Sequence, residues 1–234
     1  MALCAVEPIM PASITIDFVS DVSCPWCAIG LAALTTAIAR LPADTATDLR
    51  IQPFELNPHM PPGGEDITAH LTKKYGSTPA QQATIRDGIR QRGAALGFEF
   101  RPQGRDRIYN TFNAHRLLHW AGLRGAAYPS AQYALKQQLL TAYFTDGHSP
   151  ESIDTLLDAA ARAGLDRAAA SDVLRSDAFA DAVRVDEARF ARLGIQAVPA
   201  TILNGRYLIS GGQAVEVFER ALRQALEEST ALAR

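Results

Sequence analysis

The sequence predicts an α/β fold in which the two ends of the chain build one sheet and a large all-helical segment is inserted between them. Residues 14–56 have the pattern strand, helix, strand, and residues 200–226 have the pattern strand, strand, helix. Neither end supplies enough strands for a stable sheet of its own. We therefore expect all the strands to share one sheet, with the helical residues 66–193 as an insertion.

The first end of the chain contains two strands and one helix. Residues 14–19 form an apolar, β-branched run that predicts a buried strand. A helix follows from Cys24 and ends near Leu41-Pro42, since proline cannot continue it. Residues 49–56 alternate apolar and polar side chains and predict the second strand. The proline- and glycine-rich residues 57–64 then predict a loop.

The inserted segment is expected to contain seven helices. A Thr78-Pro79 start gives one of them an N-cap followed by proline in the first turn, and Ser149-Pro150 gives a similar signal. The aromatic residues of this segment fall at helical spacing and are expected in the core: Trp120, Tyr133, Tyr143 and Phe144. The predicted helices cover residues 67–75, 79–96, 110–123, 130–144, a stretch from 149, 167–174 and 177–193.

The second end of the chain predicts a hairpin and a closing helix. Residues 200–203 and 206–209 flank Asn204-Gly205, the strongest short signal for a two-residue hairpin turn. Gly211-Gly212 interrupts the chain, and residues 214–226 predict an amphipathic helix. The domain prediction is a flexible tail at 1–13, a sheet domain from 14–64 and 194–234, and an inserted helical domain at 65–193.

Composition excludes several classes of function. The 234 residues are 47% hydrophobic, enough for a sizeable core, and the formal net charge of −2 gives no reason to expect nucleic acid or an anionic membrane as partner. No run approaches the roughly 20 apolar residues of a membrane-spanning helix. Residues 1–13 contain no Lys or Arg and two prolines, which does not fit a signal peptide, so a cytoplasmic location is expected.

Two of the three cysteines form a Cys24-Pro25-Trp26-Cys27 motif at a strand-to-helix junction, while Cys4 lies in the tail without an obvious partner. Such a pair fits either redox chemistry or half of a zinc site. Zinc needs two further ligands, and no second CxxC or nearby Cys/His pair exists. His115 and His119 have helical metal spacing, but they lack an accompanying acidic motif. We therefore expect a redox pair and no metal, nucleotide or flavin.

The two cysteines are expected to have different roles. Cys24 at the first turn faces the unpaired N–H groups of a helix end, which favour a thiolate. Cys27, one turn further in, is more enclosed. Cys24 is thus the predicted attacking sulfur and Cys27 the sulfur that resolves the mixed disulfide. Pro25 lacks an N–H and Trp26 is bulky enough to cover part of the pair.

This arrangement, with Val198-Pro199 just before the third strand, is that of the thioredoxin fold, so the full fold prediction is a thioredoxin fold with a large helical insertion. The chain resembles the DsbA family, and more closely its FrnE-like branch, which is related to 2-hydroxychromene-2-carboxylate isomerase and kappa-class glutathione transferases. The resemblance implies a cis Val198–Pro199 bond that turns the backbone toward the sulfurs. The matching segments are residues 21–27, 53–58, 113–116, 198–199 and 209–213.

The resemblance also implies roles for other residues. Asp17, on the strand beneath the motif, is the candidate proton acceptor for the resolving thiol, and Glu55 is a weaker one. Four residues match positions near the substrate or thiol pocket of the related isomerases: Asn57, His115, Gly212 and Gln213. Those isomerases generally lack the cysteine pair and hold glutathione with a serine, whereas both cysteines are present here.

The sequence therefore predicts a cytoplasmic thiol–disulfide oxidoreductase of the reductase or isomerase type, working through a mixed disulfide. Its expected partners are protein or low-molecular-weight thiols and disulfides, with glutathione as a candidate co-substrate. Two alternatives stay open. One is a glutathione-dependent isomerase or transferase of the 2-hydroxychromene-2-carboxylate isomerase type, and the other is a non-catalytic thioredoxin-fold binding module. The sequence does not determine the oligomeric state.

Overall fold

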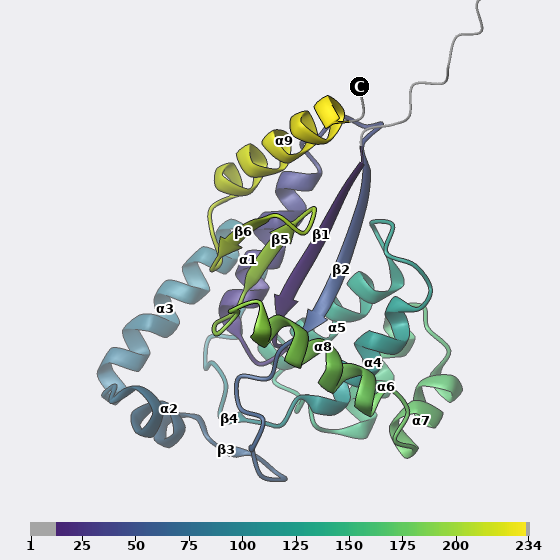
Figure 1. Cartoon of the computed structure of the whole chain (residues 1–234). Helices are drawn as coiled ribbons and strands as arrows, with labels where there is room; N and C mark the ends of the chain where they lie inside the picture. The colour runs from purple at the N-terminus through teal and green to yellow at the C-terminus, as the bar shows by residue number, and fades with distance from the viewer. Residues whose placement is uncertain (1–12, 233–234) are drawn as a thin grey trace, which may run out of the picture.

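One four-stranded sheet joins the two ends of the chain, as the sequence predicts. The computed structural model describes residues 13–232, so Cys4 and the predicted tail lie outside the described residues apart from Ser13, which begins a strand. The strand order is β2 (Ala46–Pro53), β1 (Ser13–Ser20), β5 (Ala200–Leu203), β6 (Tyr207–Ser210). β1 pairs in parallel with β2 and antiparallel with β5, and β6 pairs antiparallel with β5 (Figure 1).

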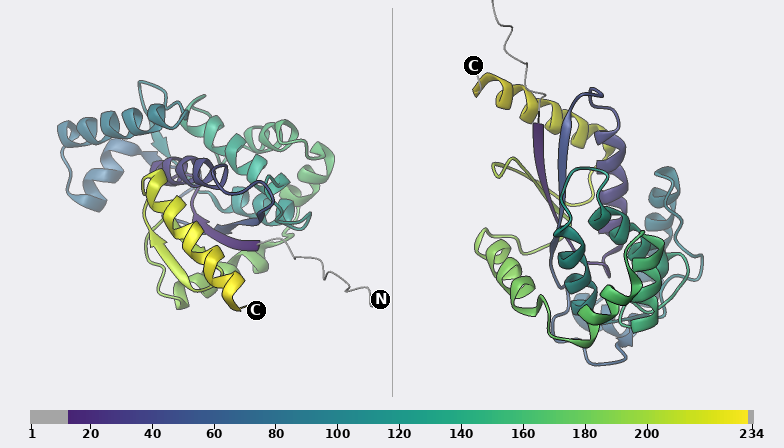
Figure 2. Two further views of the ribbon diagram at one scale, coloured as in Figure 1. Left: turned by 90° about the horizontal axis from the view of Figure 1, so that it is seen from above. Right: turned by 90° about the vertical axis from the view of Figure 1, so that its right-hand side faces the viewer.

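Helices cover both faces of this sheet. Alternate residues of β1, Ile14, Ile16 and Phe18, are buried in the cluster formed by α1 (Pro25–Ile38) and α9 (Val215–Leu232). On the other face, Val19 and Ala200 pack against Phe190 of α8 (Ala180–Arg192). The right-hand view of Figure 2 shows α1 and α8 on opposite sides of the strands. The period-2 alternation of β1 thus assigns its side chains to two separate layers.

The inserted segment consists of helices and loops, together with one short ladder that the sequence pattern does not predict. β3 (Glu65–Asp66) pairs antiparallel with β4 (Arg107–Ile108). Two residues per strand are too few to produce a recognisable alternation. The helices are α2 (Ile67–Tyr75), α3 (Pro79–Ala95), α4 (Phe112–Gly122), α5 (Ala131–Phe144), α6 (Ile153–Arg162), α7 (Arg167–Arg175) and α8 (Ala180–Arg192).

The inserted helices other than α8 form two groups, α4 to α7 and α2 with α3 (Figure 1). α4 and α5 pack against β2, and their apolar residues belong to the same core cluster as those of β1 and α1. The predicted aromatic core residues of this group are all buried. α2 and α3 form a separate hairpin that contacts α1, and within them only Gln82 and Gly93 are buried.

Some predicted boundaries were wrong by a few residues, each for a local reason. β2 covers residues 46–53 rather than 49–56, because the N–H of Leu56 bonds to the Asp21 carboxylate instead of a strand. The helix predicted from Ser149 begins at Ile153, since Ser149 closes a turn and Ser152 provides the N-cap. α8 begins at Ala180 because Phe179 adopts a left-handed φ of 63°.

The predicted hairpin is present, but its second strand begins at Tyr207 rather than Arg206, because Leu203 pairs with Tyr207. Asn204 and Gly205 both have positive φ, at 50° and 66°, as a two-residue turn of this kind requires. Asn204 also links three elements, because its Oδ1 accepts from the Thr15 N–H at 2.9 Å and its Nδ2 donates to Ser229 Oγ at 3.0 Å. Between residues 13 and 232, none of the helices has the length and apolarity needed to cross a bilayer.

Candidate active site

The cysteine motif lies where β1 leads into α1. Cys24 is the N-cap residue, with extended φ and ψ of −94° and 114°, and proline follows in the first turn. The N–H of Cys27 donates to the Cys24 carbonyl at 3.1 Å. Cys24 is 4% exposed and Cys27 is fully buried. Both cysteines are free thiols rather than a disulfide. Cys24 lines a cavity, described below, whereas Cys27 does not.

The pKa values of the two thiols are shifted in opposite directions. The pKa of Cys24 is lowered, first by a hydrogen bond from the Cys27 thiol and then by the Cys27 backbone, with Arg105 assisting; burial and Asp21 oppose the shift. The pKa of Cys27 is raised well above its ordinary value by burial and by its hydrogen bond to Cys24. The outer sulfur therefore favours the nucleophilic thiolate, while the inner one retains its proton.

A backbone segment from the other end of the chain faces the outer sulfur. Cys24 Sγ lies 3.7 Å from the Val198 carbonyl oxygen, and the Val198–Pro199 peptide bond is cis, as the resemblance implies. Gly30 allows this approach, because a Cβ there would lie 3.0 Å from Pro199 Cγ. A Cβ on Gly212 would lie 2.9 Å from the Trp26 carbonyl oxygen. The glycines thus allow α1, the proline loop and residues 211–212 to pack closely.

Asp21 is a buried acid whose importance the sequence analysis missed. It is 1% exposed, and its Oδ2 accepts from the Leu56 N–H at 2.8 Å and from Ser23 Oγ at 2.9 Å. His115 Nε2 lies 3.6 Å from Asp21 Oδ1. Burial alone would raise the pKa of Asp21, but His115 and these donors hold it well below its usual range. His115 thus faces Asp21, inside the protein.

Lys136 on α5 is a second buried charge that the sequence analysis missed. Its side chain is fully buried, and its Nζ has no hydrogen-bond partner within the part of the chain described. Burial lowers its pKa, while the charges of Cys27, Asp21 and Cys24 oppose that shift. A signal was available, because Lys136 lies on the apolar stripe of its helix, three residues after Tyr133 and four before Leu140.

Asp17 does not line the cavity next to Cys24, whereas Glu55 does, and the side chains of both are engaged elsewhere. Asp17 accepts a hydrogen bond from Gln52 Nε2 at 2.6 Å, and the charges that act on the cysteines belong to Asp21, Arg105 and Lys136. Glu55 forms an ion pair with Arg184, while burial raises its pKa. The structure thus gives the position beside the pair to Asp21 rather than to the predicted Asp17.

A cavity of about 700 Å³ opens beside the motif, lined by Cys24, Pro25, Trp26 and Val198 on one side and by α2 and α3 on the other. Asn57 lines it, and its Oδ1 accepts from Lys74 Nζ at 2.8 Å. Gly212 and Gln213 do not line it, and Gln213 donates to the Ser210 carbonyl at 2.7 Å. Of the four predicted pocket residues, therefore, only Asn57 lines the cavity next to the sulfur.

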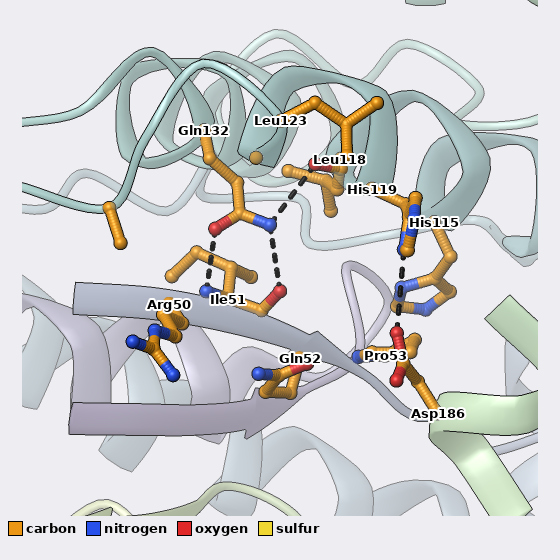
Figure 3. Close-up of a pocket in the computed structure, with 12 residues that line it drawn as sticks. Arg50, Ile51, Gln52, Pro53, His115, Leu118, His119, Leu123, Gln132 and Asp186 are labelled. Atoms are coloured by element: carbon orange, nitrogen blue, oxygen red, sulfur yellow. Dashed lines mark hydrogen bonds and ion pairs between the residues drawn. The ribbon is translucent and has the colours of Figure 1, made fainter. Parts of the chain in front are cut away.

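A smaller cavity of about 220 Å³ lies between β2 and α4 (Figure 3). His119 Nδ1 is 3.4 Å from Asp186 Oδ2 there, and the Gln132 side chain bonds to both the N–H and the carbonyl of Ile51. His115 and His119 therefore have different carboxylate partners. Among residues 13–232, no three His, Cys, Asp or Glu side chains are arranged to hold a metal ion.

Comparison with known proteins agrees with this geometry. The family model of the DSBA-like thioredoxin domain matches residues 15–223. The crystal structure of a probable DsbA oxidoreductase from Streptomyces coelicolor is 35% identical, with a TM-score of 0.83 over 92% of this chain and 91% of that chain. The uncharacterized protein YwbO from Bacillus subtilis is 25% identical over 90% of this chain and 96% of its own length.

A more distant structure shares the fold alone. It is the cytosolic disulfide reductase DsbM from Pseudomonas aeruginosa with glutathione, which is 18% identical, with a TM-score of 0.61 over 91% of this chain and 99% of that chain. The family match covers the β1–α1 junction, all the inserted helices and the β5–β6 hairpin. This chain belongs to the DSBA-like thioredoxin domain family.

Proposed function

We propose that the protein is a thiol–disulfide oxidoreductase that reduces or isomerises disulfides through Cys24 and Cys27. The observation that carries the proposal is the polarised thiol pair: an N-cap sulfur with a lowered pKa beside a buried sulfur with a raised one. Family membership supports the same chemistry, and the Streptomyces coelicolor relative at 35% identity is named a probable oxidoreductase.

The proposed cycle has two exchange steps. The Cys24 thiolate attacks one sulfur of a substrate disulfide, forms a mixed disulfide and expels the other substrate sulfur as a thiolate, which takes up a proton. Cys27 then loses its proton, attacks Cys24 and expels the second substrate sulfur. The substrate gains two electrons and the pair becomes a disulfide. Two equivalents of a low-molecular-weight thiol, for which we propose glutathione, then return the pair to the dithiol and are themselves joined as one disulfide, which carries away the two electrons.

The neighbours of the pair have distinct proposed roles. Pro25 leaves the first turn without one N–H donor, and Arg92 stacks over the Trp26 ring at 5.1 Å, which holds the indole at the cavity wall. Val198 and Pro199 present a carbonyl to the outer sulfur. Lys136, as a buried cation beside Cys27, favours the thiolate that the second step needs.

The proposal includes an organisation of the chain and a location. Residues 14–64 and 194–234 form the thioredoxin-like part that carries the cysteines, and the inserted residues 65–193 supply the opposite cavity wall. We propose that the protein works in the cytoplasm, where thiol reductants are abundant. Fractionation of cells with an antibody against the native protein tests the location directly.

An insulin-reduction assay tests the reaction. Wild type should precipitate insulin chains in the presence of glutathione or dithiothreitol, and Cys24→Ser should be inactive. Cys27→Ala should instead accumulate a mixed disulfide that mass spectrometry detects at Cys24. A wild type that does not reduce insulin but isomerises a hydroxychromene carboxylate with glutathione would favour the isomerase alternative. A Cys24 thiol of ordinary pKa that alkylates slowly would favour a binding module.

A further inference from the structure

The cavity next to Cys24 is positively charged in a chain of net charge −2. Five of its lining side chains are cationic: Lys74, Arg86, Arg90, Arg101 and Arg105. Among the described lining residues, the one carboxylate is that of Glu55, which is already paired with Arg184. His70 also lines the cavity and faces Glu65. The described lining of the cavity therefore carries more cationic side chains than carboxylates.

The five cations are not equally available to a ligand. Arg105 donates to the Ser23 carbonyl at 2.6 Å, Arg101 lies 3.7 Å from Asp106, and Lys74 bonds to backbone and amide oxygens. Arg90 makes only a long contact, at 4.0 Å, to Asp87 on its own helix.

Arg86 has no ion pair or hydrogen bond to any other described residue. It projects from α3 one turn before Arg90, so the two guanidinium groups lie on one face of that helix. Within the charged wall, Arg86 has no described partner to release and Arg90 has only its long contact to Asp87, so this pair is the part most open to an anion.

Most of the remaining large side chains of the wall are apolar, beside a few polar ones such as Thr68 and Gln82. α2 contributes Ile67 and Leu71, and α3 contributes Ile85 and Ile89. The phenyl rings of Phe100 and Phe144 also line the wall. Ile85 is 53% exposed and Tyr75 is 64% exposed, although both are large hydrophobic residues at the cavity rim. A volume of about 700 Å³ lies within the range of pockets that enclose small organic ligands.

We propose that this cavity selects low-molecular-weight disulfides that combine an apolar body with one or more acidic groups. The apolar body lies against Ile85 and Ile89, the acidic group reaches Arg86 and Arg90, and one sulfur reaches Cys24. The inference rests on the proposed exchange chemistry of Cys24 and Cys27 and adds the class of substrate. In the first exchange the Cys24–substrate S–S bond forms as the substrate S–S bond breaks, and one acidic thiolate leaves. Cys27 releases the second.

Three disulfides separate the charge from the apolar body. 5,5′-Dithiobis(2-nitrobenzoic acid) is aromatic and acidic, 4,4′-dithiodipyridine is aromatic and neutral, and cystamine is cationic without a ring. Reduced wild-type protein is mixed with each at pH 7 and low ionic strength, and the second-order rate constant of thiol release is measured by stopped flow. The ratio of the acidic to the neutral aromatic rate constant reports on charge selection, because changes in Cys24 itself affect both.

Arg86→Gln and Arg90→Gln should each lower that ratio about fivefold, as expected for removing one partly screened charge near an anion. The matched control is Arg175→Gln on α7, which removes the same charge from an exposed position that does not line the cavity. It should leave the ratio at the wild-type value. Ile85→Ser, at a half-exposed position, should slow both aromatic disulfides relative to cystamine.

The substrate class is wrong if Arg86→Gln and Arg90→Gln leave the ratio unchanged, or lower it no more than Arg175→Gln does. That outcome would leave the exchange chemistry intact, since all three disulfides would still react at Cys24. A wild type that reacts with none of them, and does not reduce insulin, would instead overturn the proposed function. Circular dichroism of each variant confirms that the ratios come from folded protein.

Discussion

The hydrogen bond between the two thiols should account for much of the reactivity of Cys24. Cys27→Ala removes the thiol donor but retains the backbone N–H of residue 27, the helix end and Arg105. Because the site of Cys27 is fully buried, no water replaces the lost donor. We therefore expect the pKa of Cys24 to rise toward its ordinary value.

The magnitude follows from the kind of bond that is lost. Hydrogen bonds to charged groups contribute about 1.5–3 kcal/mol, and a thiol is a weak donor, so the lower end applies. A loss of about 1.5 kcal/mol corresponds to a factor of about ten in the acid dissociation constant of Cys24. At pH values below its titration midpoint, the rate of alkylation should fall by the same factor, because it tracks the fraction of thiolate.

The assay is the pH dependence of iodoacetamide alkylation at Cys24, followed by mass spectrometry in a Cys4→Ser background. Cys27→Ser is the matched control, since its hydroxyl keeps a donor in place and should reduce the rate less than Cys27→Ala does. Equal pH profiles for wild type and Cys27→Ala would refute the reasoning. Equal losses in the Ala and Ser variants would show that packing, rather than the donor, sets the acidity.

Four further outcomes are expected. Lys136→Met should raise the free energy of unfolding by about 1–2 kcal/mol in urea titrations, because it removes a buried amine without a partner, and yet slow the second thiol release in stopped flow. The pKa of Asp21 is lower in the folded state than in the unfolded state. Its carboxylate therefore stabilises the fold at pH values above the unfolded-state pKa of about 4, and this stabilisation is lost as the pH falls through the folded-state pKa. Asp21→Asn should thus be less stable than wild type at pH 7, by about 1–3 kcal/mol, with a gap that narrows below about pH 4. Gly212→Ala should lower both the melting temperature and the rate of disulfide reduction, because the added Cβ would lie 2.9 Å from the Trp26 carbonyl oxygen. Gly88→Ala is the control and should lower neither, because no atom beyond the adjoining helix backbone lies within 4 Å of a Cβ at that position. Amides of α2 and α3 should exchange with deuterium faster than those of α1, because those two helices bury few side chains.

Features encoded by adjacent residues could be predicted from the sequence. The cysteine motif, the Asn204-Gly205 turn and the buried alternation of β1 each depend on neighbours in the chain, and all three are present as expected. The sequence also predicted that both ends share one sheet, because neither end has enough strands to form a stable sheet alone.

Features made by residues distant in sequence were harder to predict. Asp21 becomes the buried acid of the site only through the N–H of Leu56 and the ring of His115, which come from two other segments. Asp17 has a similar position in the pattern, but its side chain meets Gln52. The cationic cavity wall likewise exists only because α3 folds over the end of α1.

The contact between Cys24 and Val198 has a consequence for how the protein is made. The two residues are 174 positions apart. At a synthesis rate of 5–20 residues per second, Val198 emerges roughly 10–35 s after the cysteines. Strand β1 can pair with β2 early, but its other edge pairs with β5, which is synthesised much later. The active site is therefore complete only in the finished chain. Synthesis that stops before Val198 leaves the two cysteines without the backbone carbonyl that faces Cys24.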